Sequence, residues 1–329
     1  MKLLLASATS WSPGNKNTHH VKSFAVAFIL FVFMVPGGGQ AQPVRTATNA
    51  ENADKKPVPR AEINYTVTEV FPLEGKFIIA VNRARELALV GDSAASFVDK
   101  KRKVTDFECA VFSDGATQRL TTPSGINNHG DIVGFCHDDL GLLQTGFLRS
   151  KNGSLFQFTA PGSTSTVANG INDFGQIVGR SFGTSGALSF IRSSDGTRYQ
   201  NILPPTIEAL VEAVAINNSL KVLGHYSDST GRHAFLWNNG QFTELRVPGS
   251  TDGNDARQLN NNDQVLIYAS VDGVASPYLY NAGNYFLINS PEGYTWQSIN
   301  ALNDHGELTG LAFNDQNVFF DIIAKPSKK

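Results

Sequence analysis

The sequence predicts an all-β fold, a six-bladed β-propeller with four short strands in each blade. Three observations lead to this prediction: the composition, a repeat of about 44 residues, and chain ends that complement one another. Of the 329 residues, 41% are apolar, only 17% are charged, and 30 are Gly. This composition favours short strands joined by many turns over long helices.

The repeat is clearest in a short core, which reads GINNHGDIVG at residues 125–134 and GINDFGQIVG at residues 170–179. Six copies follow one another at steps of 43 or 45 residues, with leading asparagines Asn82, Asn127, Asn172, Asn217, Asn260 and Asn303. The leading Asn is expected to hydrogen-bond the backbone of a tight turn, and the Gly to supply a positive φ. Leu220 and Asp263 replace this Gly in two copies, so the turn there either changes type or carries strain.

A further strand, with a recurring aromatic residue, follows each core. Its aromatic residues are Phe97, Phe147, Phe190, Phe235, Tyr278 and Phe319. We expect them to pack between neighbouring sheets. A turn, a fourth strand and a connector follow, and the connector reads PGST at residues 161–164 and again at 248–251. Four strands in 40 to 50 residues is typical of a propeller blade.

The chain ends predict how the ring closes. The last copy stops after its third strand, at residues 318–323, and the segment Tyr65–Pro72 resembles the fourth strand at residues 242–248. The N-terminal strand is therefore predicted to complete the last blade, in a propeller over residues 63–325 with a tail at 326–329. A solenoid is the alternative, but its ends would not need to complement each other.

The N-terminal region is typical of an export signal. Residues 24–35 form an apolar run behind Lys22, and small residues follow at Gly39 and Ala41. This pattern predicts a signal peptide over residues 1–41, then a flexible linker over 42–62. An uncleaved membrane anchor is the alternative, although twelve apolar residues fall short of the roughly 20 that a span needs. The predicted location is secreted or periplasmic, and a monomer with no membrane span after cleavage is expected.

Charge and cysteine content restrict the partners and the redox state. The first 41 residues hold three Lys and no acid, so their removal changes the net charge from −2 to −5. A nucleic-acid partner is therefore not expected. Cys109 and Cys136 lie in strand-like segments of neighbouring repeats. In an oxidising compartment they either form a disulfide or remain two buried thiols.

The repeat motifs resemble a known family. HAFLW at residues 233–237, the GINN and GIND cores and the PGST connectors are similar to those of the extracellular HAF-repeat family of bacteria. The resemblance covers residues 67–323, although only one copy keeps the literal HAF. It implies an exported repeat protein with a propeller-like fold and an unknown biochemical role. It brings no catalytic residues and no cofactor.

Candidate site residues follow from their place in the fold, because the sequence contains no catalytic or cofactor-binding motif. The cores superficially resemble calcium loops, but most copies offer one carboxylate or none, so no metal site is predicted. Propellers bind ligands on loops at one face. The candidates there are Arg180, His225, Asp255, Arg257, Glu292, Tyr294 and Trp296.

Two classes of function remain open. The first is a binding or scaffolding module that recognises a glycan or a protein, with Tyr294 and Trp296 either stacking on a sugar or packing in the core. The second is a hydrolase or lyase with an axial acid/His site, for which Glu212 would join His225 and Asp255. Whether the protein is an enzyme stays open at this point, and the absence of a catalytic motif favours a binding module.

Overall fold

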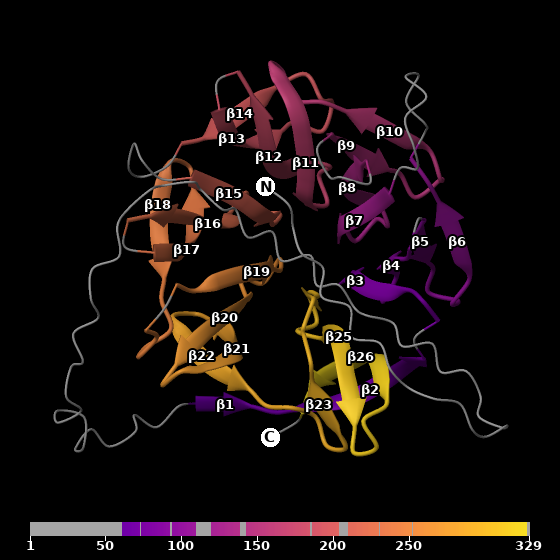
Figure 1. Cartoon of the computed structure of the whole chain (residues 1–329), viewed down its shortest axis with the longest axis vertical. Helices are drawn as coiled ribbons and strands as arrows, with labels where there is room; N and C mark the ends of the chain where they lie inside the picture. Colours follow the sequence, from indigo (N-terminus) through magenta and orange to yellow (C-terminus); the bar gives the residue numbers. More distant parts are fainter. Residues whose placement is uncertain are drawn as a thin grey trace, which may run out of the picture. The chain divides into compact units, whose positions relative to one another are not determined.

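The computed structural model describes residues 61–72, 74–92, 94–109, 120–138, 143–184, 186–203, 210–229, 231–251 and 253–327. Within these ranges the chain forms six sheets that stand around a central axis (Figure 1). This confirms the predicted all-β propeller of six blades with four strands each. No helix in the described part of the chain is long and apolar enough to cross a membrane.

Each blade is an antiparallel sheet whose strands follow one another from the axis outwards. Blade 1 consists of β3 (Phe77–Val81), β4 (Leu87–Val90), β5 (Ala95–Val98) and β6 (Val104–Phe107). Blade 2 consists of β7 (Leu120–Ile126), β8 (Ile132–His137), β9 (Gln144–Arg149) and β10 (Leu155–Phe158). Blade 3 consists of β11 (Ser163–Ile171), β12 (Ile177–Gly183), β13 (Gly186–Arg192) and β14 (Tyr199–Ile202).

The remaining three blades repeat this order. Blade 4 consists of β15 (Leu210–Ile216), β16 (Val222–Asp228), β17 (Gly231–Asn238) and β18 (Gln241–Leu245). Blade 5 consists of β19 (Asp255–Leu259), β20 (Val265–Val271), β21 (Val274–Asn281) and β22 (Asn284–Ile288). Blade 6 has its inner strand in two pieces, β23 (Tyr294–Trp296) and β24 (Ala301–Leu302), followed by β25 (Leu308–Asn314) and β26 (Phe319–Pro326).

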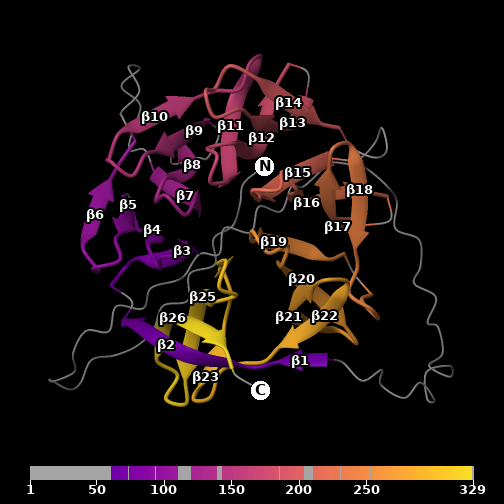
Figure 2. The same cartoon turned by 180° about the vertical axis from the view of Figure 1, so that it is seen from behind.

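The ring closes with the predicted N-terminal strand. Strand β2 (Tyr65–Pro72) pairs antiparallel with β26 and supplies the fourth strand of blade 6. Strand β1 (Ala61–Ile63) adds a fifth strand to blade 5, because it pairs parallel with the outer strand β22. Figure 2 shows this N-terminal segment running along the outer side of blades 5 and 6. The inner strands contact one another in sequence, and β24 returns to β3.

The leading Asn of each repeat builds the turn between the first and second strands, as predicted. In blade 2 the side-chain Oδ1 of Asn127 accepts hydrogen bonds from the backbone N–H of His129 (3.0 Å) and of Asp131 (2.9 Å). Leu220 and Asp263, which replace the turn Gly, keep the same turn with φ values of 60° and 61°. These two turns therefore hold a left-handed backbone that L-residues disfavour, instead of changing type.

The recurring aromatic is buried between blades in five copies, as expected, and exposed in the sixth. Phe147 lies directly opposite Gly134, where a Cβ would come within 2.7 Å of the ring, so Gly makes room for it. In blade 1 the equivalent position is Ser96, and Phe97 one residue later is buried on the other side of the sheet. In blade 6 the expectation for Phe319 is wrong, because it is 43% exposed and Ile322 takes the core position.

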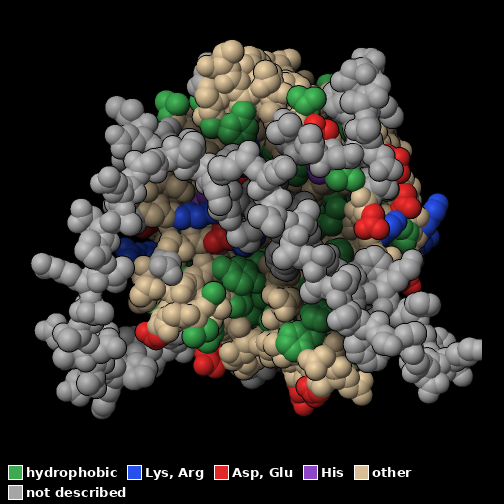
Figure 3. All heavy atoms as spheres, viewed as in Figure 1, with side chains coloured by type: hydrophobic (Ala, Val, Ile, Leu, Met, Phe, Trp, Pro, Cys, Tyr) green, Lys and Arg blue, Asp and Glu red, His purple; other side chains and the backbone are tan. Residues whose placement is uncertain are grey.

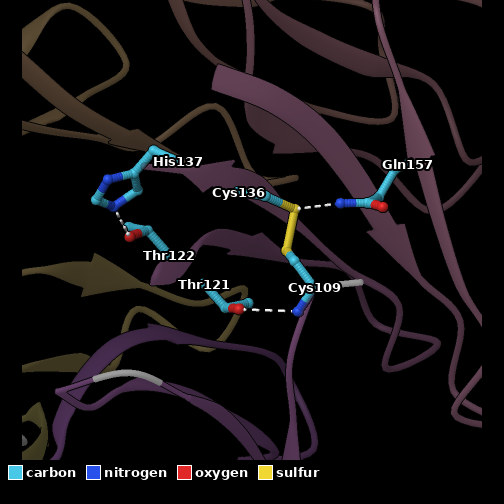
Figure 4. Close-up of a disulfide and its surroundings, with 6 residues drawn as sticks. All are labelled: Cys109, Thr121, Thr122, Cys136, His137 and Gln157. Carbon is cyan, nitrogen blue, oxygen red and sulfur yellow. Dashed lines mark hydrogen bonds between the residues drawn. A yellow bond between two sulfur atoms is a disulfide. The ribbon is translucent and has the colours of Figure 1, made fainter. Parts of the chain in front are cut away.

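Cys109 and Cys136 form a disulfide, one of the two states that the sequence left open. It joins the segment that follows β6 of blade 1 to strand β8 of blade 2, across the boundary between the two blades (Figure 4). Both residues are buried. The backbone N–H of Cys109 donates to Thr121 Oγ1 at 3.0 Å, and Gln157 Nε2 donates to the sulfur of Cys136 at 2.9 Å. The bridge therefore fixes the position of blade 1 against blade 2.

Candidate binding face

A ring of hydrogen bonds links the six leading asparagines at one end of the inner strands. Asn127 Nδ2 donates to the carbonyl oxygen of Asn172 at 3.2 Å, and Asn303 Nδ2 donates to that of Asn82 at 3.2 Å, which closes the circle. The other four links join Asn82 to Asn127, Asn172 to Asn217, Asn217 to Asn260 and Asn260 to Asn303. The repeated Asn is therefore engaged in holding each blade to the next.

The residue after each leading Asn forms a second ring, nearer the axis. Its members are Arg83, Asn128, Asp173, Asn218, Asn261 and Asp304. Asn128 Nδ2 donates to Asp173 Oδ2 at 2.9 Å and to Asp304 Oδ2 at 2.7 Å. All members of this ring except Asn218 line a cavity of about 50 Å³. One water needs about 10–15 Å³, so this cavity holds a few waters and excludes a sugar ring.

The opposite ends of the inner strands carry the polar residues that differ between repeats. Arg180, His225 and Tyr268 each lie eight residues after a leading Asn, in blades 3, 4 and 5. Glu212 and Asp255 each lie five residues before one, and they face His225 and Tyr268 directly across the strand pair. In blades 1, 2 and 6 the position eight residues after the Asn holds Val90, Phe135 and Leu311. The polar face is thus confined to blades 3 to 5.

Six residues form a continuous line of contacts there, which we call the charged band. It consists of Arg180, Glu212, His225, Arg232, Asp255 and Arg257. Figure 3 shows basic, acidic and His side chains next to one another over β15 to β17. The band crosses three blades, because Arg180 comes from β12, Glu212 from β15 and Asp255 from β19.

In blade 4, Glu212 is held by a His and two Arg residues. Its carboxylate lies 2.8 Å from His225 Nε2 and 3.5 Å from an Arg180 nitrogen, while Arg232 contacts both ring nitrogens of His225. Burial alone would raise the pKa of Glu212. The hydrogen bond from His225 and the charges of Arg180 and Arg232 outweigh burial and lower this pKa to about 2. Glu212 is therefore ionised throughout the neutral range.

Arg232 carries the band on to blade 5. Its guanidinium lies 3.1 Å from one oxygen of Asp255, whose other oxygen lies 2.6 Å from Arg257. The close approach depends on Gly253, because a Cβ there would lie 2.2 Å from the Arg232 carbonyl oxygen. Arg257 also lies over the ring of Tyr268, 5.5 Å from its centroid. The side chains of Arg232 and Arg257 are 45% and 54% exposed, so both guanidinium groups face solvent.

The two predicted aromatics lie at the same end of blade 6. Tyr294 and Trp296 are on one side of β23, with the exposed Thr295 between them on the other side. Both are partly buried: Tyr294 packs edge-on against Phe320 with ring centroids 6.2 Å apart, and Trp296 packs against the core between blades 5 and 6. Glu292 is exposed just before them. Their role in binding stays a prediction.

The structure brings four of the seven candidate binding residues together with Glu212, which the acid/His alternative names, and adds Arg232. Arg180, His225, Asp255 and Arg257 belong to the charged band, together with Glu212 and Arg232. Arg232 was missing from the candidates because it opens a third strand, and only the cross-strand register shows that it reaches Asp255. The band is a line of ion pairs along the face, and none of its six residues lines the axial cavity. Among the described residues no group of three or more His, Cys, Asp or Glu is placed to hold a metal ion.

Comparison with known proteins supports the fold and goes no further. No family model matches the sequence, and no curated protein matches it. A protein assigned as TolB from Agrobacterium tumefaciens superposes with a TM-score of 0.50 at 10% identity, covering 77% of this chain and 91% of its own. A streptogramin B lyase (TM-score 0.42, 14% identity, 79% and 87% covered) and a gluconolactonase from Xanthomonas campestris (0.45, 10%, 83% and 99%) are also similar. At 10% identity the likeness to the TolB structure concerns the fold alone.

Proposed function

We propose that the protein is an exported β-propeller of the HAF-repeat type that binds a glycan through the charged band. The observation that carries the proposal is the line of six charged and polar side chains across three blades, with two solvent-facing guanidinium groups at Arg232 and Arg257. Such a line offers both donors and acceptors in fixed positions, which is what a ligand rich in hydroxyl groups requires. Because the acids are already paired, the guanidinium groups remain oriented when no ligand is present.

Export is part of the same proposal. It is supported by the apolar run at residues 24–35, which lies outside the described residues, and by the disulfide between Cys109 and Cys136. Disulfides persist in oxidising compartments such as the periplasm and the extracellular space. The protein then meets its ligand as a monomer in one of these compartments.

The test is retention on insoluble polysaccharides. Wild-type protein and the Arg257→Ala variant are passed over cellulose, chitin and calcium pectate, with Arg198→Ala as the matched control. Arg198 is an exposed arginine just before the outer strand β14 of blade 3, outside the charged band. We expect one of the three materials to retain the wild type and the control, and to retain Arg257→Ala at least about fivefold less. No retention on any of them, or equal retention of all three proteins, overturns the proposal.

The aromatic pair of blade 6 gives the proposal a second test. If Tyr294 and Trp296 extend the binding face, replacing both by Ala abolishes retention. Because both rings are partly buried against neighbouring residues, the melting temperature also falls by several degrees. The variant is therefore assayed well below its own melting temperature. Unchanged retention would restrict the site to the charged band.

A second function is favoured by one contact, the 2.8 Å pair of His225 and Glu212. A carboxylate that orients an imidazole is the arrangement of a general base. A propeller hydrolase or lyase would use this pair on a bound polysaccharide. Release of reducing ends or of unsaturated products from the retained polysaccharide, lost in His225→Gln, would establish it. Retention without any product would leave binding as the function.

A further inference from the structure

A second cavity lies between blades 5 and 6, and none of the six charged-band residues lines it. It measures about 280 Å³. Its apolar lining comes from Ile63 of β1, Leu279 of β21, Phe286 of β22 and Pro326 at the end of β26. Glu62 and Gln264 add polar groups. We call this space the blade 5/6 cavity.

The repeat explains why the cavity exists. In each blade one residue near the end of the third strand pairs with the first residue of the second strand and faces the preceding blade. In blades 2 to 5 this residue is large and planar: Arg149, Arg192, Trp237 and Tyr280. In blade 6 it is Ala324, opposite Leu308. At this position the boundary between blades 5 and 6 lacks the planar group that four other boundaries have; the boundary between blades 6 and 1 has Val98 there.

At two boundaries the planar group is a guanidinium stacked on aromatic rings. The Cζ of Arg149 lies 4.9 Å and 5.0 Å from the ring centroids of Phe97 and Phe107 in blade 1. Arg192 lies 4.7 Å from the ring centroid of Phe158 in blade 2. Stacking of a planar cation on an aromatic face is favourable, more so when it is shielded from water. These contacts show which chemistry the fold accommodates at this position.

Blade 5 presents a matching surface, and Ala324 of blade 6 is buried in the cluster that contains it. Leu279 and Phe286 are neighbours across the β21 and β22 pair, as Leu148 and Phe156 are in blade 2. In addition, β1 brings the carboxylate of Glu62 to the edge of the cavity, where one of its oxygens accepts a hydrogen bond from Asn289 at 3.0 Å. A carboxylate has about four acceptor positions, so this bond leaves capacity for a ligand.

We propose that the blade 5/6 cavity binds a planar organic cation, such as an aromatic amidine, a guanidine or a protonated aromatic amine. The planar part lies on Phe286 and Leu279 in place of the missing side chain, and the charged end meets Glu62. The size of the cavity is suitable. An apolar cavity of about 150 Å³ binds benzene. The blade 5/6 cavity, at about 280 Å³, has additional room for an amidinium group and its water. The proposal does not depend on the charged band.

Benzamidine, a single ring with an amidinium group, is the probe, and the neutral benzamide is its control. Binding to the wild-type protein is measured by isothermal titration calorimetry and by the rise in melting temperature, up to about 10 mM ligand. Glu62→Gln removes the charge from an exposed residue and is not expected to affect folding. Ala324→Trp places in blade 6 the residue that blade 4 has at the same position, Trp237.

We expect saturable binding of benzamidine to the wild type, about fivefold weaker binding to Glu62→Gln, and no binding to Ala324→Trp. Benzamide should bind wild type and Glu62→Gln equally. Absence of saturable binding to the wild type overturns the proposal, and so do equal benzamidine affinities for wild type and Glu62→Gln. If Ala324→Trp does not fold, the ratio of benzamidine to benzamide affinity in the other two proteins decides the question.

Discussion

A buried carboxyl group at the closure of the ring makes the stability of this protein depend on pH. Asp321 lies on β26 between β25 and the closing strand β2, and its side chain is 2% exposed. Oδ2 accepts a hydrogen bond from the backbone N–H of Ile78 in blade 1 at 2.8 Å. Oδ1 has no hydrogen-bond partner among the described residues. Burial raises the pKa of Asp321 from 3.8 to about 6, although the bond from Ile78 opposes this.

The direction of the pH effect depends on whether Asp321 binds its proton more tightly in the folded or in the unfolded protein. The pKa of Asp321 is higher in the folded protein than in the unfolded chain, so its contribution to stability is complete below pH 3.8 and is lost as the pH rises through 6. A change in pKa from 3.8 to about 6 corresponds to about 3 kcal/mol in the free energy of unfolding. At neutral pH the ionised Asp321 therefore lowers the free energy of unfolding by this amount.

Asp321→Asn removes the charge and keeps an oxygen that accepts from Ile78. Between pH 3.5 and 7.5 the free energy of unfolding of the variant, relative to wild type, should rise by about 3 kcal/mol. Urea denaturation of both proteins at both pH values measures this difference. The titration of all other groups affects the variant and the wild type equally and therefore cancels. Asp321→Leu is the control, because it also carries no titratable group at this position. It leaves the Ile78 N–H without an acceptor, so it should be less stable than Asp321→Asn by about 1–3 kcal/mol. A difference between wild type and Asp321→Asn that does not change with pH would refute the reasoning.

Three further predictions concern the closure, the disulfide and the turns. Deleting Tyr65–Pro72 should lower the melting temperature far more than deleting residues 42–60, because it exposes the edge of β26; equal melting temperatures would contradict this. Replacing both Cys109 and Cys136 by Ala should lower the free energy of unfolding by about 3.5 kcal/mol, given a sequence separation of 27, and a loss under about 1 kcal/mol would argue against it. Leu220→Gly should raise stability by up to about 1 kcal/mol, because Gly adopts φ of 60° without strain; a denaturation curve that shows a loss would contradict it.

The fold was predictable because its determinants are local and recur. The leading Asn and the turn that it builds are visible in the sequence as one short motif, and six copies of it define six blades. Strand β1 was not predictable, because three polar-flanked residues that pair parallel with β22 leave no periodic signal. The side of the sheet on which Phe97 lies was not predictable for a similar reason. In the first copy Ser96 and Phe97 are adjacent, and the choice between them depends on the register with β4, which the turn length decides.

The sequence predicts where the candidate site lies, but not which of its side chains contact one another. The loop face could be named because propeller topology gathers the starts of the inner strands at one end. That Glu212 contacts His225 follows from their cross-strand register, which depends on a β-bulge between Ala213 and Ala215 and therefore cannot be counted from the turn at Asn217 alone. The link through Arg232 depends on how closely two blades approach at Gly253, which no pattern within one repeat contains.

Residues that recur in every repeat and residues that differ between repeats have different roles, and this difference explains where ligand sites arise in this protein. The asparagines common to all copies use their amide groups to join neighbouring blades, and the Asn and Asp residues of the ring beside them hydrogen-bond one another. Neither ring has capacity left for a large ligand. The position that Arg180 and His225 occupy in the charged band is apolar in three other blades, and Ala324, at the boundary with the blade 5/6 cavity, stands where four blades have a planar side chain. Both proposed sites are therefore departures from the repeat, built on a frame that the repeat keeps rigid. Restoring the repeat at these positions should then remove binding without loosening the ring, and the Ala324→Trp substitution does this at the second site.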